Sequence, residues 1–150
     1  MSIVKKVHMC IMMAPESSFE DTVKFYKEIG LTSKFHIENK WAEFDIGGLL
    51  IGICPTSKEL PDRSTGLVMQ VDDLQSVYEN QKDLITFLAE PVEAIHGIMV
   101  SVKDPSGNIF DLYQPTPEKV KDLVQKAKEE ECCATPCQKE QSCKDDDCCC

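Results

Sequence analysis

The sequence lacks several features that would assign it to a broad class of proteins. It has no run of about 18 apolar residues, so we expect no transmembrane helix and no membrane partner. Its first residues, MSIVKKVHMC, lack the apolar stretch and cleavage site of a signal peptide, so we expect a cytoplasmic protein. Positive charge is scarce, because the formal net charge is −10. Such a chain repels phosphate backbones, which argues against nucleic acid as a partner.

Cysteine is scarce through most of the chain, although the total is nine. Only Cys10 and Cys54 lie before residue 132, and the other cysteines crowd into the last nineteen positions. A disulfide framework distributes its cysteines along the chain, so we expect no fold held by disulfides. The 42% of hydrophobic residues instead suit one domain with an apolar core.

The first half of the chain predicts the order β-α-β-β-β. A β-rich stretch over residues 3–12 predicts the opening strand. A helix follows, with Ser18 among its capping residues, apolar residues at helical spacing, and Gly30 at its end. The segment 33–55 then reads as three strands joined by two short turns.

The second half repeats this order. Residues 65–73 predict a strand, 74–84 a helix, and 90–114 three further strands with DPSGN as a tight turn. The sequence therefore predicts an α+β domain over 1–115, built from tandem modules at about 3–54 and 66–114. Residues 116–131 predict a C-terminal helix, and 132–150 a disordered, cysteine-rich tail.

Three stretches of the sequence resemble one known family. They are FEDTVKFYKEIGL in the first helix, TGLVMQVDDL at the start of the second module, and VKDPSGNIFDLYQP at its end. These stretches resemble the vicinal oxygen chelate superfamily, which includes glyoxalase I, extradiol dioxygenases, and bleomycin and fosfomycin resistance proteins. The resemblance implies two βαβββ modules whose curved sheets enclose a concave site, in a homodimer.

The resemblance also implies metal ligands at up to four strand positions. His8 matches the first position and Asp111 the fourth, whereas Gly52 and Gly66 fall at the second and third. Glycine has no side chain to coordinate a metal, although Cys54 shares a face with Gly52 and could substitute. We therefore expect no complete catalytic metal site and no required cofactor, with a divalent metal in the groove as an alternative.

Asp111 stands out because it interrupts an apolar strand, GNIFDLYQP. A buried carboxylate costs several kcal/mol unless it is paired, hydrogen-bonded or bound to a metal. We expect Asp111 to face the groove, either toward a ligand or in a hydrogen bond to His8 or a backbone amide. In the second case the residue has only a structural role.

Alternation along the strands predicts which other side chains line the groove. The helix-facing set includes Ile11 in the first strand and Phe35 and Ile37 in the second. The groove face of the first module is then predicted to carry His8, Cys10, Met12, His36, Trp41, Glu43 and Asp45. That of the second module is predicted to carry Gln70, Met99, Ser101, Asp111 and Tyr113. An acidic and aromatic groove favours a flat or cationic small molecule, although each residue also has a structural interpretation.

Three functions stay open at this point. The first is a binding protein that holds a small molecule in the groove. The second is a metal-dependent lyase or dioxygenase in which His8 and Asp111 are catalytic, as an acid-base pair. The third is soft-metal or metalloid binding by the thiols of the tail, Cys132, Cys133, Cys137, Cys143, Cys148, Cys149 and Cys150.

Overall fold

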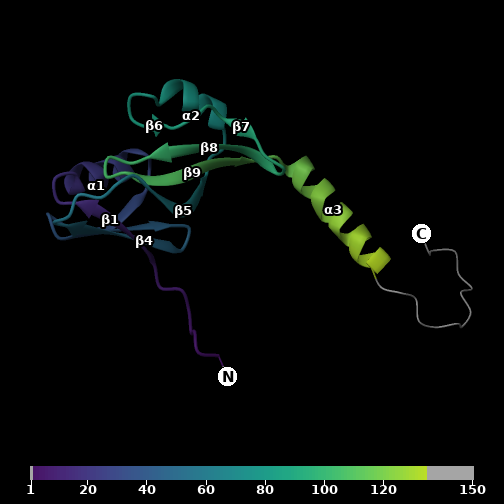
Figure 1. The fold of residues 1–150 in the computed structure, drawn as a ribbon, viewed down its shortest axis with the longest axis horizontal. Helices are drawn as coiled ribbons and strands as arrows, with labels where there is room; N and C mark the ends of the chain where they lie inside the picture. Colours follow the sequence, from purple (N-terminus) through teal and green to yellow (C-terminus); the bar gives the residue numbers. More distant parts are fainter. Residues whose placement is uncertain (1, 135–150) are drawn as a thin grey trace, which may run out of the picture.

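The computed structural model describes residues 2–134, and Figure 1 shows how the elements are arranged. The first βαβββ module contains β1 (Cys10–Pro15), α1 (Phe19–Glu28), β2 (Thr32–Ile37), β3 (Trp41–Ile46) and β4 (Leu49–Thr56). The second contains β5 (Arg63–Gln70), α2 (Leu74–Asn80), β6 (Thr86–Phe87), β7 (Val92–Glu93), β8 (Gly97–Lys103) and β9 (Asn108–Pro115). The last helix is α3 (Pro117–Ala134).

The two modules build sheets of the same topology. The first sheet has the order β1-β4-β3-β2, and the second has the order β5-β9-β8-β6, with β7 also on β8. In each sheet the opening strand pairs in parallel with the closing strand, as β1 does with β4 and β5 with β9. The predicted α+β class and tandem organisation are therefore confirmed.

Several elements differ from the prediction. The opening strand was expected over 3–12, but β1 begins only at Cys10, and residues 2–8 run exposed away from the body (Figure 1). The strand expected near 90–95 is reduced to the two residues of β7, and β6 was not predicted at all. The last helix continues to Ala134, three residues past its predicted end.

One apolar core joins the two modules, and α1 lies at its centre. Phe19, Val23 and Tyr26 recur at helical spacing and are fully or almost fully buried. The Tyr26 ring lies 6.0 Å from the Phe44 ring in the first sheet and 6.1 Å from the Phe110 ring in the second. The same helix therefore packs on both sheets, which fixes one module against the other.

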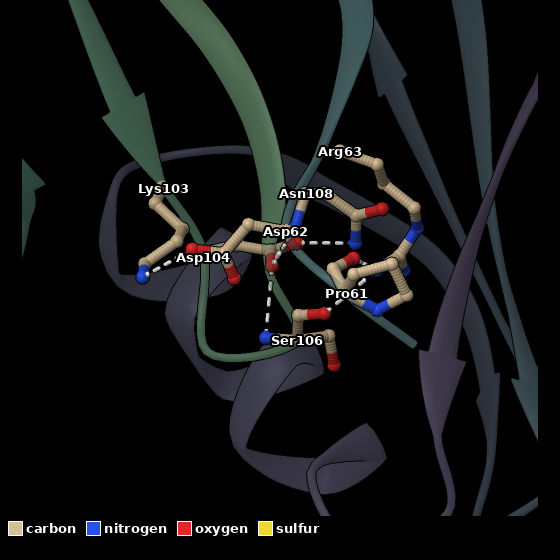
Figure 2. A network of polar contacts seen from close by, with 7 residues as sticks. All are labelled: Pro61, Asp62, Arg63, Lys103, Asp104, Ser106 and Asn108. Carbon is tan, nitrogen blue, oxygen red and sulfur yellow. Dashed lines mark hydrogen bonds and ion pairs between the residues drawn. The ribbon is translucent and has the colours of Figure 1, made fainter. Parts of the chain in front are cut away.

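A buried polar network stabilises the junction between the modules, and Figure 2 shows part of it. Asp104, at the start of the DPSGN turn, is only 3% exposed. Its Oδ1 accepts hydrogen bonds from the backbone N–H groups of Ser106 (2.8 Å) and Asn108 (2.9 Å). Its Oδ2 accepts from Tyr26 Oη (2.8 Å) and Asn108 Nδ2 (2.7 Å). A fully satisfied carboxylate of this kind fixes the turn that leads into β9.

Arg63 makes the second link at this junction. Its guanidinium donates to the carbonyl oxygens of Pro61 (3.1 Å), Ser106 (3.0 Å) and Met13 (Figure 2 labels the first two). Asn108 Nδ2 also donates to the Met13 carbonyl, at 3.1 Å. The end of β1 is therefore bound to the starts of β5 and β9. No helix within residues 2–134 is long and apolar enough to cross a lipid bilayer.

Candidate functional site

A cavity with a volume of about 690 Å³ lies between the modules and is lined by residues of both. We call it the inter-module cavity. Its floor is the helix-facing side of the second sheet, with Leu67 and Met69 on β5 and Phe110 and Leu112 on β9. Its walls are the end of α1, the β3–β4 turn, and the segment that includes α2: residues 28–32, 45–49 and 77–85.

The late start of β1 leaves one end of β4 without a neighbouring strand beside the cavity. Cys10 pairs with Ile51, so β1 leaves the first two residues of β4 without a partner on that side. One of them, Leu49, is 40% exposed and lines the cavity. A strand that began at residue 3, as the sequence predicted, would have continued past this end of β4.

The charged side chains that line this cavity are acidic. They are Glu28 at the end of α1 and Asp45 at the end of β3. Asp45 Oδ1 accepts a hydrogen bond from the Gly48 N–H at 3.0 Å, which holds the β3–β4 turn. Glu28 lies 3.7 Å from Lys24, in an exposed pair that screens it only weakly. Neutral polar groups come from Thr32, Gln70 and Gln81, and the remaining side chains are apolar.

Each sheet has one face that packs on the core and one that does not, and we call the second the open face. A second group of candidate residues lies on the open face of the second sheet. Ser101 Oγ donates to Asp111 Oδ1 at 2.6 Å, and the two residues are opposite each other in the β8–β9 pairing. Met99 and Tyr113 form the neighbouring pair on the same face. Asp111 therefore has a hydrogen-bond partner, but this partner is Ser101 and not His8.

The open face of the first sheet carries Trp41 directly over Gly52. A Cβ atom added at Gly52 would lie 2.5 Å from Trp41 Cη2 and 3.4 Å from Met9 Sδ. Glu43 is opposite Gly52 in the β3–β4 pairing and shares this face. The indole ring therefore occupies the space that a larger side chain at position 52 would need.

Two of the predicted strand faces are wrong. Met12 is 2% exposed and belongs to the core, whereas Ile11 is 54% exposed, so the face assigned to Cys10 and Met12 is the buried one. The second strand is reversed as well. Phe35 is 46% exposed, and His36 turns to α1, where its Nε2 lies 3.0 Å from Glu20 Oε2. The irregular pairing between Ser33 and Phe35 shifts the alternation along β2.

The predicted site residues thus fall into separate places. Asp45 and Gln70 line the inter-module cavity. Trp41 and Glu43 are on the open face of the first sheet, and Met99, Ser101, Asp111 and Tyr113 are on that of the second. His8 is exposed before β1 and makes no hydrogen bond among the described residues. Sequence reasoning missed the apolar lining of the cavity, because residues such as Leu67 and Leu84 read as ordinary core positions.

Comparisons with known proteins test the family resemblance through the structure. No protein-family model matches this sequence, and no curated protein matches it. Among solved structures, the fosfomycin resistance protein FosX from Listeria monocytogenes aligns with a TM-score of 0.64 at 16% identity, over 81% of this chain and 99% of that one. The bleomycin-binding protein from Streptomyces verticillus aligns with a TM-score of 0.55 at 16% identity, over 75% and 100%.

A third structure, a glyoxalase/bleomycin resistance protein/dioxygenase from Nocardioides, aligns with a TM-score of 0.57 at 14% identity, over 75% of this chain and 85% of that one. The chain has the vicinal oxygen chelate fold. Identities this low establish the fold and leave the activity open. One crystal structure of FosX contains Mn(II) together with a dihydroxypropylphosphonic acid, whereas the Streptomyces protein was crystallised with copper(II)-bleomycin.

Two of the strand positions that the family resemblance assigns to metal ligands are glycines in this chain. Gly52 is covered by the Trp41 ring, and Gly66 has a φ of +71°, a conformation that favours glycine. Within residues 2–134, no three His, Cys, Asp or Glu side chains come close enough to hold a metal. Cys54, the predicted substitute, directs its Sγ toward the Pro55 carbonyl at 3.7 Å. We therefore derive no reaction step through a metal.

The cysteine-rich tail lies almost entirely outside the described residues. Only the backbone of Cys132 and Cys133 is included, at the end of α3. Soft-metal binding by the tail stays a prediction.

Proposed function

We propose that this protein binds a small molecule in the inter-module cavity, without a metal cofactor. The observation that carries the proposal is the cavity itself. Its volume of about 690 Å³ falls within the range of about 300–1,000 Å³ typical of ligand pockets. Such pockets combine apolar walls with a few polar groups that orient the ligand, which is also the composition of this lining.

The proposed ligand is a flat or compact apolar molecule with a positive charge. Leu67, Met69, Val77 and Leu84 offer apolar contact area. The two acidic groups described above attract a cation, and no lysine, arginine or histidine is among the lining residues. The bleomycin-binding protein supports a binding role for the fold, because its name describes binding and not catalysis. As the family resemblance predicts, the binding protein acts as a homodimer.

Calorimetric titration with two matched probes tests this proposal. N-methylacridinium carries a permanent positive charge, whereas acridine at pH 8 has nearly the same shape and no charge. We expect both to bind and the cation to bind more tightly. Asp45→Asn keeps an acceptor for Gly48 N–H but removes a charge, so it should weaken the cation by about 2- to 5-fold and leave acridine unchanged.

A steric variant separates the cavity from the open faces of the sheets. Val77→Phe adds volume to the cavity wall and should weaken both probes. Val92→Phe is the matched control, because Val92 is 60% exposed on β7 and does not line the cavity. Unchanged binding of both probes to Val77→Phe would contradict the proposed site. Equal affinity for the two probes, in the wild type and in Asp45→Asn alike, would contradict the proposed preference for a cation.

A further inference from the structure

Helix α3 leaves the body of the protein in a fixed direction. A single residue, Thr116, separates it from β9, and the Thr116 N–H donates to the His96 carbonyl at 3.1 Å. One turn later, Lys119 Nζ lies 2.7 Å from Glu93 Oε2 on β7. Figure 1 shows that the rest of the helix projects away from both sheets. The helix therefore cannot turn back onto its own body without breaking these contacts.

The projecting helix carries an apolar stripe that nothing covers. Val120, Leu123 and Val124 are 37%, 37% and 48% exposed, and Ala127 continues the stripe by one turn. Their i, i+3, i+4, i+7 spacing is that of a helix face that packs on a partner. A helix of this length that stands alone in water is only marginally stable, so a partner surface would stabilise it.

Charge is distributed around α3 in a way that selects the partner. By helical periodicity, four lysines border the apolar stripe, with Lys121 and Lys128 along one side and Lys119 and Lys126 along the other. The acidic residues of the same turns are on the opposite face, namely Glu118, Asp122 and Glu129. Lys119 already pairs with Glu93. The charge along the stripe that is unpaired within residues 2–129 therefore comes from Lys121, Lys126 and Lys128, and it favours a partner surface that is apolar and carries acidic groups.

The open face of the first sheet has both properties. Ile11, Phe35 and Ile37 are exposed apolar side chains on its two outer strands, with exposures of 54%, 46% and 49%. Ile11, Gly52, Glu43 and Phe35 form one continuous row across the four strands. Strands β1, β3 and β4 contain no lysine or arginine, and β2 contains one, Lys34. Glu43 has no ion-pair partner among residues 2–129.

We propose that α3 of one copy docks across the open face of the first sheet of a second copy, and that the exchange is reciprocal. The stripe then covers the exposed row, and the flanking lysines approach Glu43. Because each copy supplies one helix and one sheet face, the contact closes as a two-fold dimer. Pairing of α3 with α3 is disfavoured, because it would bring the two sets of lysines together. The first sheet lines the inter-module cavity only with Thr32, residues 45–47 and Leu49, none of which belongs to the exposed row.

Sedimentation equilibrium of the full chain in reductant tests the helix side of this contact. The wild type should be a dimer. Leu123→Asp places a charge in the stripe and should raise the dimer dissociation constant by about 30-fold or more. Gln125→Asp introduces the same residue outside the stripe and should leave the constant unchanged. Both positions are exposed, so the body should keep its unfolding midpoint, which is measured in parallel.

Charge reversal tests the sheet side. Glu43→Lys and Lys121→Glu should each weaken the dimer, and combining them should restore part of the lost affinity. A monomeric wild type would overturn the proposal. If Leu123→Asp weakens the dimer but Glu43→Lys does not, the contact is between two α3 helices. That result would also overturn the proposal. A monomeric chain whose α3 binds phosphatidylserine vesicles through Leu123 would likewise overturn the proposal.

Discussion

The hydrogen bond between Tyr26 and Asp104 gives the sharpest test of how the modules are joined. Tyr26→Phe removes one donor from a carboxylate that is 3% exposed. The phenylalanine ring keeps its contacts with Phe44 and Phe110, so the loss is confined to the hydrogen bond. A hydrogen bond to a charged group contributes about 1.5–3 kcal/mol, so the free energy of unfolding should fall by about that amount.

Urea unfolding, followed by circular dichroism and by the emission of the single tryptophan, measures this change. In a chain of this size, each kcal/mol corresponds to a melting temperature lower by about 2–4 °C. Tyr78→Phe is the matched control, because no hydrogen bond of the Tyr78 hydroxyl is found within residues 2–134, and it should change stability by less than about 0.5 kcal/mol. Equal stability of the two variants would refute the role of this network.

Three further predictions follow from particular contacts. Gly52→Ala should displace the Trp41 ring, shift its emission to longer wavelength and cost about 1–3 kcal/mol; unchanged emission would contradict the placement of the ring over Gly52. Burial raises the pKa of Tyr26 far above its ordinary value, and Asp104 adds to this. The folded state therefore keeps a proton that the unfolded state loses above about pH 10, so stability should fall with rising pH there, and less steeply in Tyr26→Phe. Burial raises the pKa of Glu20, but the Asn39 N–H and His36 lower it more, so the net pKa is below its usual value. The contribution of the Glu20 carboxylate to the free energy of unfolding should therefore be lost as pH falls below about 4.5. The loss should be less than about 1 kcal/mol because the side chain is partly exposed to solvent. Glu20→Gln should remove this acid dependence.

The repeated element order was readable from the sequence because local signals define most of the elements. The first helix has apolar positions at regular spacing and a glycine after its end, and the DPSGN turn precedes β9 at the predicted place. The first strand was misplaced because residues 3–9 have β propensity but pair with no strand among residues 2–134, and pairing decides whether a strand forms. The faces of this strand were also assigned wrongly. Met12 was placed in the groove and Ile11 toward the helix, whereas Met12 is buried and Ile11 is exposed. Because side chains alternate along a strand, one wrong assignment reverses all of them.

The candidate site was only partly predictable. Asp111 was expected to face a ligand or to accept a hydrogen bond from His8 or a backbone amide, whereas its hydrogen-bond partner is Ser101 on the neighbouring strand. The cavity is lined by five segments that are distant in sequence. Neither the packing of α1 on both sheets nor the position of Trp41 over Gly52 has a local sequence signal.

The central claim is that a small molecule binds between the modules and not on the open faces of the sheets. Methyl NMR of isoleucine, leucine and valine side chains during a titration with N-methylacridinium tests it directly. We predict that the methyl signals of Leu67, Leu84 and Ile85 shift, because these residues line the cavity. Shifts confined to Ile11 and Ile37, on the open face of the first sheet, would contradict the account, as would no shift at saturating probe.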